Sequence, residues 1–262
     1  MDKVRDRLWI WGHEAGSHDR DWNTPAPSRM TPAEGAYYMG IPNMIMVRYG
    51  PLDEMPAEQY AISFRPLQQV VWSIVGAGAQ TGEAERDQVL EMAGRFGNFS
   101  GVMMDDFFQL LGSDGEMAVL SQATLDQLQN RLTAGERKLN LWVVLYDYQL
   151  DLPVADHLDR CDKIAFWTWE SPNLANLEQN FDTMEKMAPH CGKILGLYLW
   201  DYGVKAPMPL ERMQQQCETG LRWLKEGRIE GMIFLASCIC DLDLETVEWT
   251  RRWIAEVGDQ AL

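Results

Sequence analysis

The sequence predicts an α/β protein that folds as a single (β/α)8 TIM barrel over residues 1–262. Short apolar runs rich in β-branched and aromatic residues recur eight times, and amphipathic segments separate them, which favours alternating strands and helices. Most runs are nearly continuous in apolar character, as is typical of parallel strands buried on both faces. A chain of 262 residues also has the length of one such barrel, since these domains run to about 250 residues.

Eight strands are expected, each followed by a polar cluster. They cover residues 8–13, 43–49, 70–78, 101–106, 141–147, 163–170, 193–201 and 231–238.

Helices are expected between the strands. Thr31, Pro32 and Glu34 combine an N-cap, a proline at the first helical position and an acid at the third, so a helix should run from Pro32 towards Gly40. Apolar residues three and four positions apart predict further helices over 83–96, 125–132, 174–187, 210–225 and 244–257. The connection from Gly12 to Met30 is long and polar, and segments of this kind are usually functional or disordered.

Composition limits the partners and the compartment. The formal net charge of −16 would repel nucleic acid and anionic membranes, so we expect neither as a partner, and the oligomeric state stays open. No run approaches the roughly 20 apolar residues of a membrane span, which favours a cytoplasmic protein, or a secreted one if a signal peptide has been removed. The five cysteines show no CxxC spacing, so free thiols are expected and zinc ribbons are excluded.

Acidic residues end four consecutive predicted strands. Asp105 and Asp106 follow the fourth, Asp147 the fifth, Glu170 the sixth and Asp201 the seventh. The carboxyl ends of barrel strands meet at one mouth, which is where catalytic groups of this fold lie. The alternative is that each acid caps the helix that follows it.

The fourth strand ends in the most suggestive pattern. If Gly101 and Met103 face the barrel interior, strand alternation points Asp105 inward as well and leaves Asp106 to begin the turn. Glycoside cleavage needs two carboxylates, and the second candidates are Asp201 and Glu170. Both neighbour tryptophan, which can shield a carboxyl from water and raise its pKa. We therefore predict Asp105 and Asp201 as the main catalytic pair, assisted by Glu170 and Asp106.

Aromatic residues near the strand ends predict a sugar site, because flat rings suit the CH-rich faces of sugars. Trp72 and Trp142 lie in the middle of apolar runs and are expected to fill the core. The residues predicted to bind substrate are His13, Arg48, Asp147, Trp169, Trp200 and Tyr202. For Arg48 a salt bridge inside the mouth is an equal alternative.

These stretches carry a resemblance to a known superfamily. Asp-Asp-Phe-Phe at 105–108, Trp-Thr-Trp-Glu at 167–170 and Trp-Asp-Tyr-Gly at 200–203 resemble the strand ends of TIM-barrel glycoside hydrolases, and no single family is matched. The more common barrel pattern, Asn-Glu after strand four and Glu after strand seven, is not present. The resemblance implies a hydrolase that acts on a carbohydrate and needs no cofactor or metal.

Two alternatives stay open. A metal-dependent sugar isomerase, epimerase or aldolase would use a cation held by His13, Asp105, Asp147, Glu170 and Asp201. A non-catalytic barrel would keep the aromatic cleft and bind sugar without turnover. The segment from His13 to His18 is not a zinc helix motif, because its histidines are five apart and Gly16 interrupts the helix.

Overall fold

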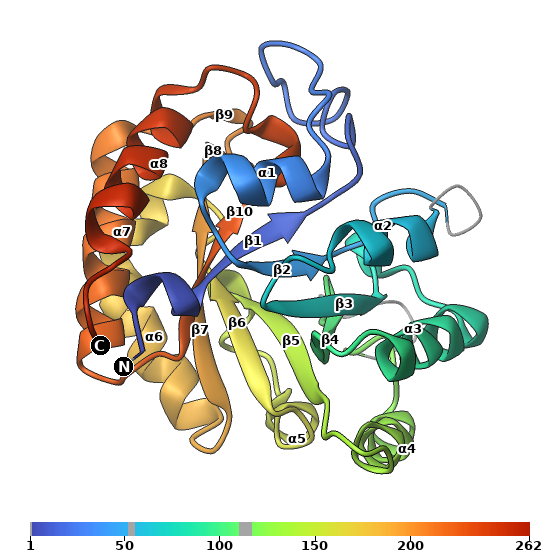
Figure 1. The fold of residues 1–262 in the computed structure, drawn as a ribbon. Helices are drawn as coiled ribbons and strands as arrows, with labels where there is room; N and C mark the ends of the chain where they lie inside the picture. Colours follow the sequence, from blue (N-terminus) through green and yellow to red (C-terminus); the bar gives the residue numbers. More distant parts are fainter. Residues whose placement is uncertain (1, 52–55, 110–116) are drawn as a thin grey trace.

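The computed structural model describes residues 2–51, 56–109 and 117–262. Eight parallel strands close into a barrel in the order β1-β10-β7-β6-β5-β4-β3-β2, and the helices lie outside it (Figure 1). The predicted (β/α)8 fold is thus confirmed. The barrel strands are β1 (Leu8–Gly12), β2 (Asn43–Met46), β3 (Gln69–Val75), β4 (Phe99–Met104), β5 (Asn140–Tyr146), β6 (Lys163–Trp167), β7 (Gly192–Tyr198) and β10 (Gly231–Leu235).

The outer helices follow the strands in sequence. They are α1 (Pro32–Met39), α2 (Ala57–Ser63), α3 (Glu83–Arg95), α4 (Gln122–Thr133), α5 (Ala155–Leu158), α6 (Leu177–Met187), α7 (Leu210–Lys225) and α8 (Glu245–Val257). The predicted start of α1 is confirmed, since the Thr31 side chain accepts from the Glu34 backbone N–H and Glu34 accepts from the Thr31 N–H. Within the described ranges, no helix combines the length and the apolar character needed to cross a bilayer.

Several predicted boundaries were wrong by a few residues. The predicted seventh strand ran to Asp201, but β7 ends at Tyr198 and β8 (Trp200–Asp201) pairs antiparallel with β9 (Ala206–Pro207). The strands predicted to reach Gly78 and Cys238 end at Val75 and Leu235, where short 3-10 turns begin. Helices α2 and α5 were not predicted, because seven and four residues are too short for a clear helical period.

Tryptophans fill the barrel interior. Trp9 of β1 and Trp142 of β5 have ring centroids 5.0 Å apart, and Trp11 of β1 lies 5.4 Å from Trp167 of β6. These strands are not neighbours in the barrel, so the rings meet across its axis. Trp142 is buried as predicted, and so is Trp72.

Glycines on neighbouring strands leave room for the large rings. A Cβ atom on Gly196 of β7 would lie 2.1 Å from the Trp167 ring, and one on Gly231 of β10 would lie 3.1 Å from Trp9 Nε1. On β4, a Cβ on Gly101 would lie 3.0 Å from Trp142 Nε1. At Gly196 the glycine is therefore required by one indole, whereas at Gly101 and Gly231 a backbone carbonyl lies closer still, that of Asn140 at 2.5 Å and that of Arg7 at 2.9 Å.

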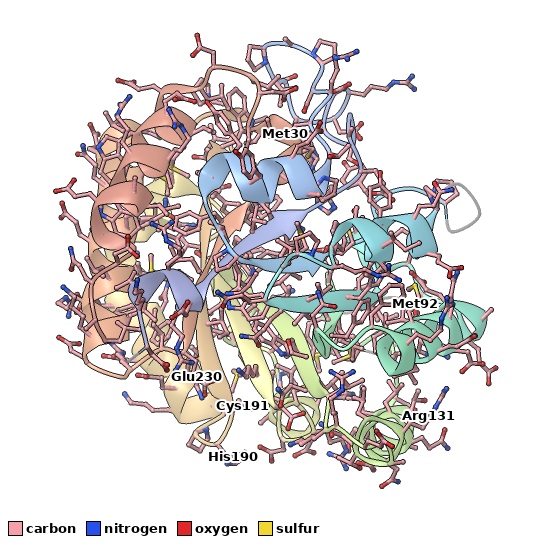
Figure 2. The ribbon with its side chains drawn as sticks, in the orientation of Figure 1. Met30, Met92, Arg131, His190, Cys191 and Glu230 are labelled. Atoms are coloured by element: carbon pink, nitrogen blue, oxygen red, sulfur yellow. The ribbon has the colours of Figure 1, made fainter. Side chains whose placement is uncertain are left out.

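The two ends of the barrel differ in what surrounds them. Figure 2 shows His190, Cys191 and Glu230 beside the starts of β7 and β10, and Met30 at the opposite end, where the segment after β1 leads into α1. The chain termini lie side by side, since Lys3 forms an antiparallel bridge with Ala261 (Figure 1). The termini thus lie at the end of the barrel where β1 begins, away from the carboxyl ends of the strands.

The packing predicts a large effect of one added methyl group. Gly196→Ala should lower the free energy of unfolding by about 3 kcal/mol, because the added Cβ would lie 2.1 Å from the buried Trp167 ring and one of the two must shift. Gly94→Ala in α3 is the matched control, since nothing lies within 4 Å of its Cβ position, and it should stabilise by about 0.5–1 kcal/mol. Urea denaturation of both variants measures the difference, and equal effects would contradict the packing described.

Candidate active site

A cavity opens at the carboxyl ends of the barrel strands. It contains about 480 Å³ of empty space, including the part that is open to solvent. Its lining residues come from loops and strand ends all around the barrel: Trp11, His13, His18, Trp22, Tyr49, Ala77, Asp105, Asp106, Tyr146, Trp167, Trp169, Tyr198, Tyr202 and Leu235.

Asp105 follows β4 and lines the cavity with a side chain that is almost fully buried, at 6% exposure. Its backbone N–H donates to the Val75 carbonyl of β3. Burial raises the pKa of the Asp105 carboxyl well above its ordinary value, and the charge of Asp106 raises it further, while the Asp106 backbone N–H opposes the shift. Asp105 is thus a carboxyl that keeps its proton where ordinary aspartates have lost theirs.

Asp106 begins the turn after β4, and its φ of 47° lies in the left-handed region that aspartate tolerates better than most residues. One carboxylate oxygen accepts from the Tyr146 hydroxyl at 2.8 Å, and the other accepts from the Gly78 backbone N–H at 2.8 Å. These two bonds fix the carboxylate at the edge of the cavity beside Asp105.

His13 lies in the cavity wall with both ring nitrogens occupied. Nδ1 lies 2.7 Å from the Val47 carbonyl, which can only accept, and Nε2 is 3.0 Å from the indole N–H of Trp11, which can only donate. The ring is therefore neutral with its proton on Nδ1. Burial lowers the pKa of His13 to about 4, and the hydrogen bond to Val47 opposes this shift.

The segment between β1 and α1 covers part of the mouth. His18 is buried and lies with Nδ1 3.0 Å from the Tyr202 hydroxyl, and Trp22 donates from its indole to the Tyr49 hydroxyl at 2.9 Å. The Trp200 indole donates to the Trp22 carbonyl at 3.0 Å. The sequence indicated that this polar segment is functional or disordered, and the structure orders it against the site.

Five of the predicted site residues line the cavity: Asp105, Asp106, His13, Trp169 and Tyr202. Asp201 does not, because its two oxygens accept from the backbone N–H groups of Ser171 and Val204, both at 3.0 Å. Glu170 is exposed outside the cavity.

Two further predicted residues hold other parts of the mouth in place. Asp147 accepts from the Trp169 backbone N–H at 3.0 Å, and Trp200 binds Trp22 as described above. Neither lines the cavity, although both fix a residue that does.

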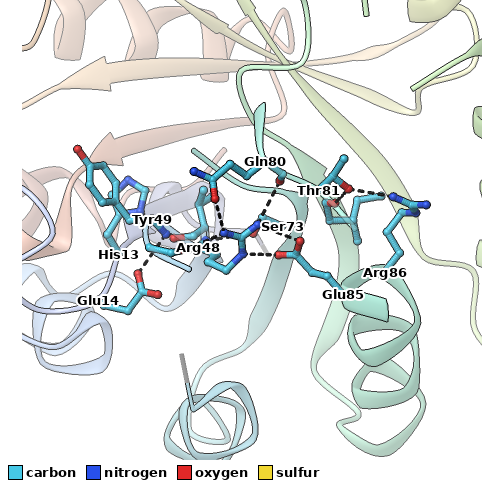
Figure 3. Close-up of polar contacts among 12 residues, drawn as sticks. His13, Glu14, Arg48, Tyr49, Ser73, Gln80, Thr81, Glu85 and Arg86 are labelled. Carbon is cyan, nitrogen blue, oxygen red and sulfur yellow. Dashed lines mark hydrogen bonds and ion pairs between the residues drawn. The ribbon is translucent and has the colours of Figure 1, made fainter. Parts of the chain in front are cut away.

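Arg48 forms a salt bridge, which was the alternative to substrate binding that the sequence left open. Its guanidinium donates to both Glu85 oxygens, at 2.6 and 3.0 Å, and both side chains are 3% exposed (Figure 3). It also donates to the Gly50 carbonyl and to Gln80. Arg48 thus ties the loops after β2 and β3 together and lies outside the cavity lining.

Sequence reasoning missed part of the aromatic lining. Tyr146 and Tyr198 are the last residues of β5 and β7, and alternation from the interior Trp142 and Gly196 points both inward. That signal was present in the sequence. His18 and Trp22 carried no such signal, because no periodicity places a residue of a long loop.

The described residues bring together no group of three or more His, Cys, Asp or Glu side chains arranged to hold a metal ion. All five cysteines are buried and unpaired.

Comparison with known proteins gives the fold but no close relative. The sequence matches no protein-family profile and no curated protein sequence. A class V chitinase mutant from Cycas revoluta, solved in complex with (GlcNAc)3, is 14% identical with a TM-score of 0.59, over 94% of this chain and 99% of that one. A proposed α-L-fucosidase from Bacteroides thetaiotaomicron is 11% identical with a TM-score of 0.62, over 99% and 98% of the two chains.

A third solved structure is a xylanase-A-amylase inhibitor protein, 12% identical with a TM-score of 0.58, over 97% of this chain and 99% of that one. At such identities the likeness shows the fold alone. The chain therefore has the barrel fold that glycoside hydrolases use, and that fold also serves an inhibitor protein.

The raised pKa of Asp105 predicts that Asp105→Asn stabilises the folded protein relative to wild type, by an amount that depends on pH. The folded chain keeps this proton to a higher pH than the unfolded chain does, so wild-type stability falls as pH rises between the two pKa values, by about 1.4 kcal/mol per pH unit. Asparagine cannot ionise and escapes this loss. The melting temperature of the variant relative to wild type should therefore rise from pH 4 towards pH 7, and a difference independent of pH would contradict the assignment.

For His13 we expect the opposite dependence of folding stability on pH, a loss of stability as pH falls. Its folded pKa of about 4 lies below the ordinary 6.5, so the stability it contributes is full above pH 6.5 and is lost as pH falls towards 4, on the order of 3 kcal/mol in total. His13→Gln removes this titration. Melting curves at intervals from pH 7.5 to 4.5 should show a smaller acid-induced loss in the variant, and parallel curves would count against a neutral, buried His13.

Proposed function

We propose that this protein cleaves a glycosidic bond in the barrel-mouth cavity, with Asp105 as the general acid. One observation carries the proposal: a buried carboxyl with a raised pKa stands beside a second, hydrogen-bonded carboxylate in a cavity walled by aromatic rings. Proton donation to the leaving oxygen requires an acid that is still protonated near neutral pH. The aromatic rings offer apolar faces to a sugar.

Asp106 takes the role that the sequence had assigned to Asp201. Its negative charge lies next to Asp105, where positive charge would develop on the sugar ring in an oxocarbenium-like transition state. The hydrogen bonds from Tyr146 and Gly78 hold this carboxylate still, so that little reorganisation is needed during the reaction. Asp201 is less suited, because it does not line the cavity and its oxygens accept the backbone N–H groups of Ser171 and Val204 outside it.

A second function is sugar binding without cleavage. The fold of this chain also serves an inhibitor protein, and both Asp106 oxygens are already occupied by hydrogen bonds. Such a barrel would keep the aromatic cavity and bind the same ligands without turnover.

The proposal predicts a specific pattern of activity loss. On a panel of aryl glycosides and oligosaccharides, Asp105→Asn should lower kcat/KM about 100-fold or more, because it removes the donated proton. Turnover by the wild type should survive EDTA. Glu256→Gln, on the exposed side of α8, removes one negative charge far from the chemistry and should leave the rate unchanged.

Three results would redirect this assignment. Loss of activity in Glu170→Gln would return the chemistry to the exposed acid that the sequence proposed. Loss on adding EDTA would favour the metal-dependent alternative. Binding without turnover by any of the folded proteins would favour the non-catalytic function.

A further inference from the structure

The cavity lining has an unusual chemical character for a polar ligand. Ten of its fourteen residues are aromatic: four tryptophans, four tyrosines and two histidines. The remainder are Asp105, Asp106, Ala77 and Leu235. Neither lysine nor arginine is among the described lining residues, and stretches 52–55 and 110–116 contain neither in their sequence.

Arg48 and Lys205 lie on segments that contribute to the mouth, and both already have partners. Arg48 donates to Glu85, and both side chains are buried outside the lining. Lys205 is exposed, and its ammonium lies 5.1 Å from the centroid of the Trp22 ring. A tryptophan of the cavity thus already accepts an ammonium group against its face.

The two histidines add no positive charge. His13 has both nitrogens occupied as a neutral ring, and burial together with the neighbouring His13 lowers the pKa of His18 well below its ordinary value. The cavity therefore presents π faces, hydroxyls and carboxylate charge, within a chain of net charge −16. The lining residues offer no counter-charge to an anionic sugar. The hydroxyls of a neutral sugar can donate to Asp106, and an ammonium group adds an opposite charge to that hydrogen bond.

We propose that the ligand of this cavity carries a positive charge, and that it is an amino sugar with a free ammonium group held between the aromatic faces and Asp106. The sugar part rests on the proposed function, whereas the preference for a cation rests on the lining alone. An ammonium over a desolvated aromatic ring and a charge-assisted hydrogen bond to a carboxylate both favour the charged ligand. N-acetylation of the same sugar removes both contributions.

The test compares ligands that differ only at the C2 substituent. The methyl glycosides of glucosamine, N-acetylglucosamine and glucose, in both anomers, are titrated against the full chain by calorimetry at pH 6 and constant ionic strength. Tetramethylammonium chloride, with sodium chloride as its control, probes the aromatic cation site without a sugar. We expect a glucosaminide to bind at least tenfold more tightly than its N-acetyl and glucose counterparts, and tetramethylammonium to compete with it.

A charge-only variant separates the carboxylate from the rings. Asp106→Asn suits the left-handed backbone at this position and should cut the preference for the glucosaminide several-fold. Glu256→Gln removes the same charge from the exposed side of α8 and should leave the preference unchanged. Melting curves establish that both variants are folded.

The outcomes distinguish this inference from the proposed function. Equal or tighter binding of the N-acetyl or glucose ligand by the wild type would overturn the inference and leave a sugar site in place. Binding of tetramethylammonium without any glycoside would support the cation site and count against a sugar substrate. Absence of binding by every probe would overturn both.

Discussion

The packing of indole rings across the barrel axis constrains the rest of this structure. Trp9 meets Trp142 and Trp11 meets Trp167, and glycines on adjacent strands give these rings their space. Trp11 and Trp167 also line the cavity, so the upper part of the core is the floor of the site. The Trp11 indole in turn fixes the ring of His13. Core packing and site geometry are therefore the same set of contacts in this barrel.

The aromatic surroundings of the cavity also determine which of its titratable side chains are charged. Asp105, His13 and His18 are buried in the aromatic wall of the cavity, and burial favours the neutral form of each. Asp106 differs in its contacts, since its two oxygens accept from a hydroxyl and a backbone N–H. Under the proposed function, the two adjacent aspartates take different chemical roles. The raised pKa of Asp105 costs folding stability above the ordinary aspartate pKa, as is common for groups tuned for function.

The sequence was sufficient for the fold and for one wall of the site. Eight apolar runs gave the eight barrel strands, and alternation from Gly101 placed Asp105 at the cavity. The same reasoning could not separate Asp105 from Asp201, because a strand-end acid looks alike whether it faces a cavity or accepts backbone N–H groups in a turn. His18, Trp22 and the Glu85 partner of Arg48 come from segments whose positions only the folded chain determines.

A direct measurement of the Asp105 carboxyl tests these ideas most closely. Infrared difference spectra between wild type and Asp105→Asn, recorded as a function of pH, isolate the carbonyl stretch of one protonated carboxylic acid. A protonated band that persists well above the ordinary aspartate pKa is the predicted result. A band that disappears near pH 4 would show an ordinary, ionised aspartate and would contradict its role as the acid of the site.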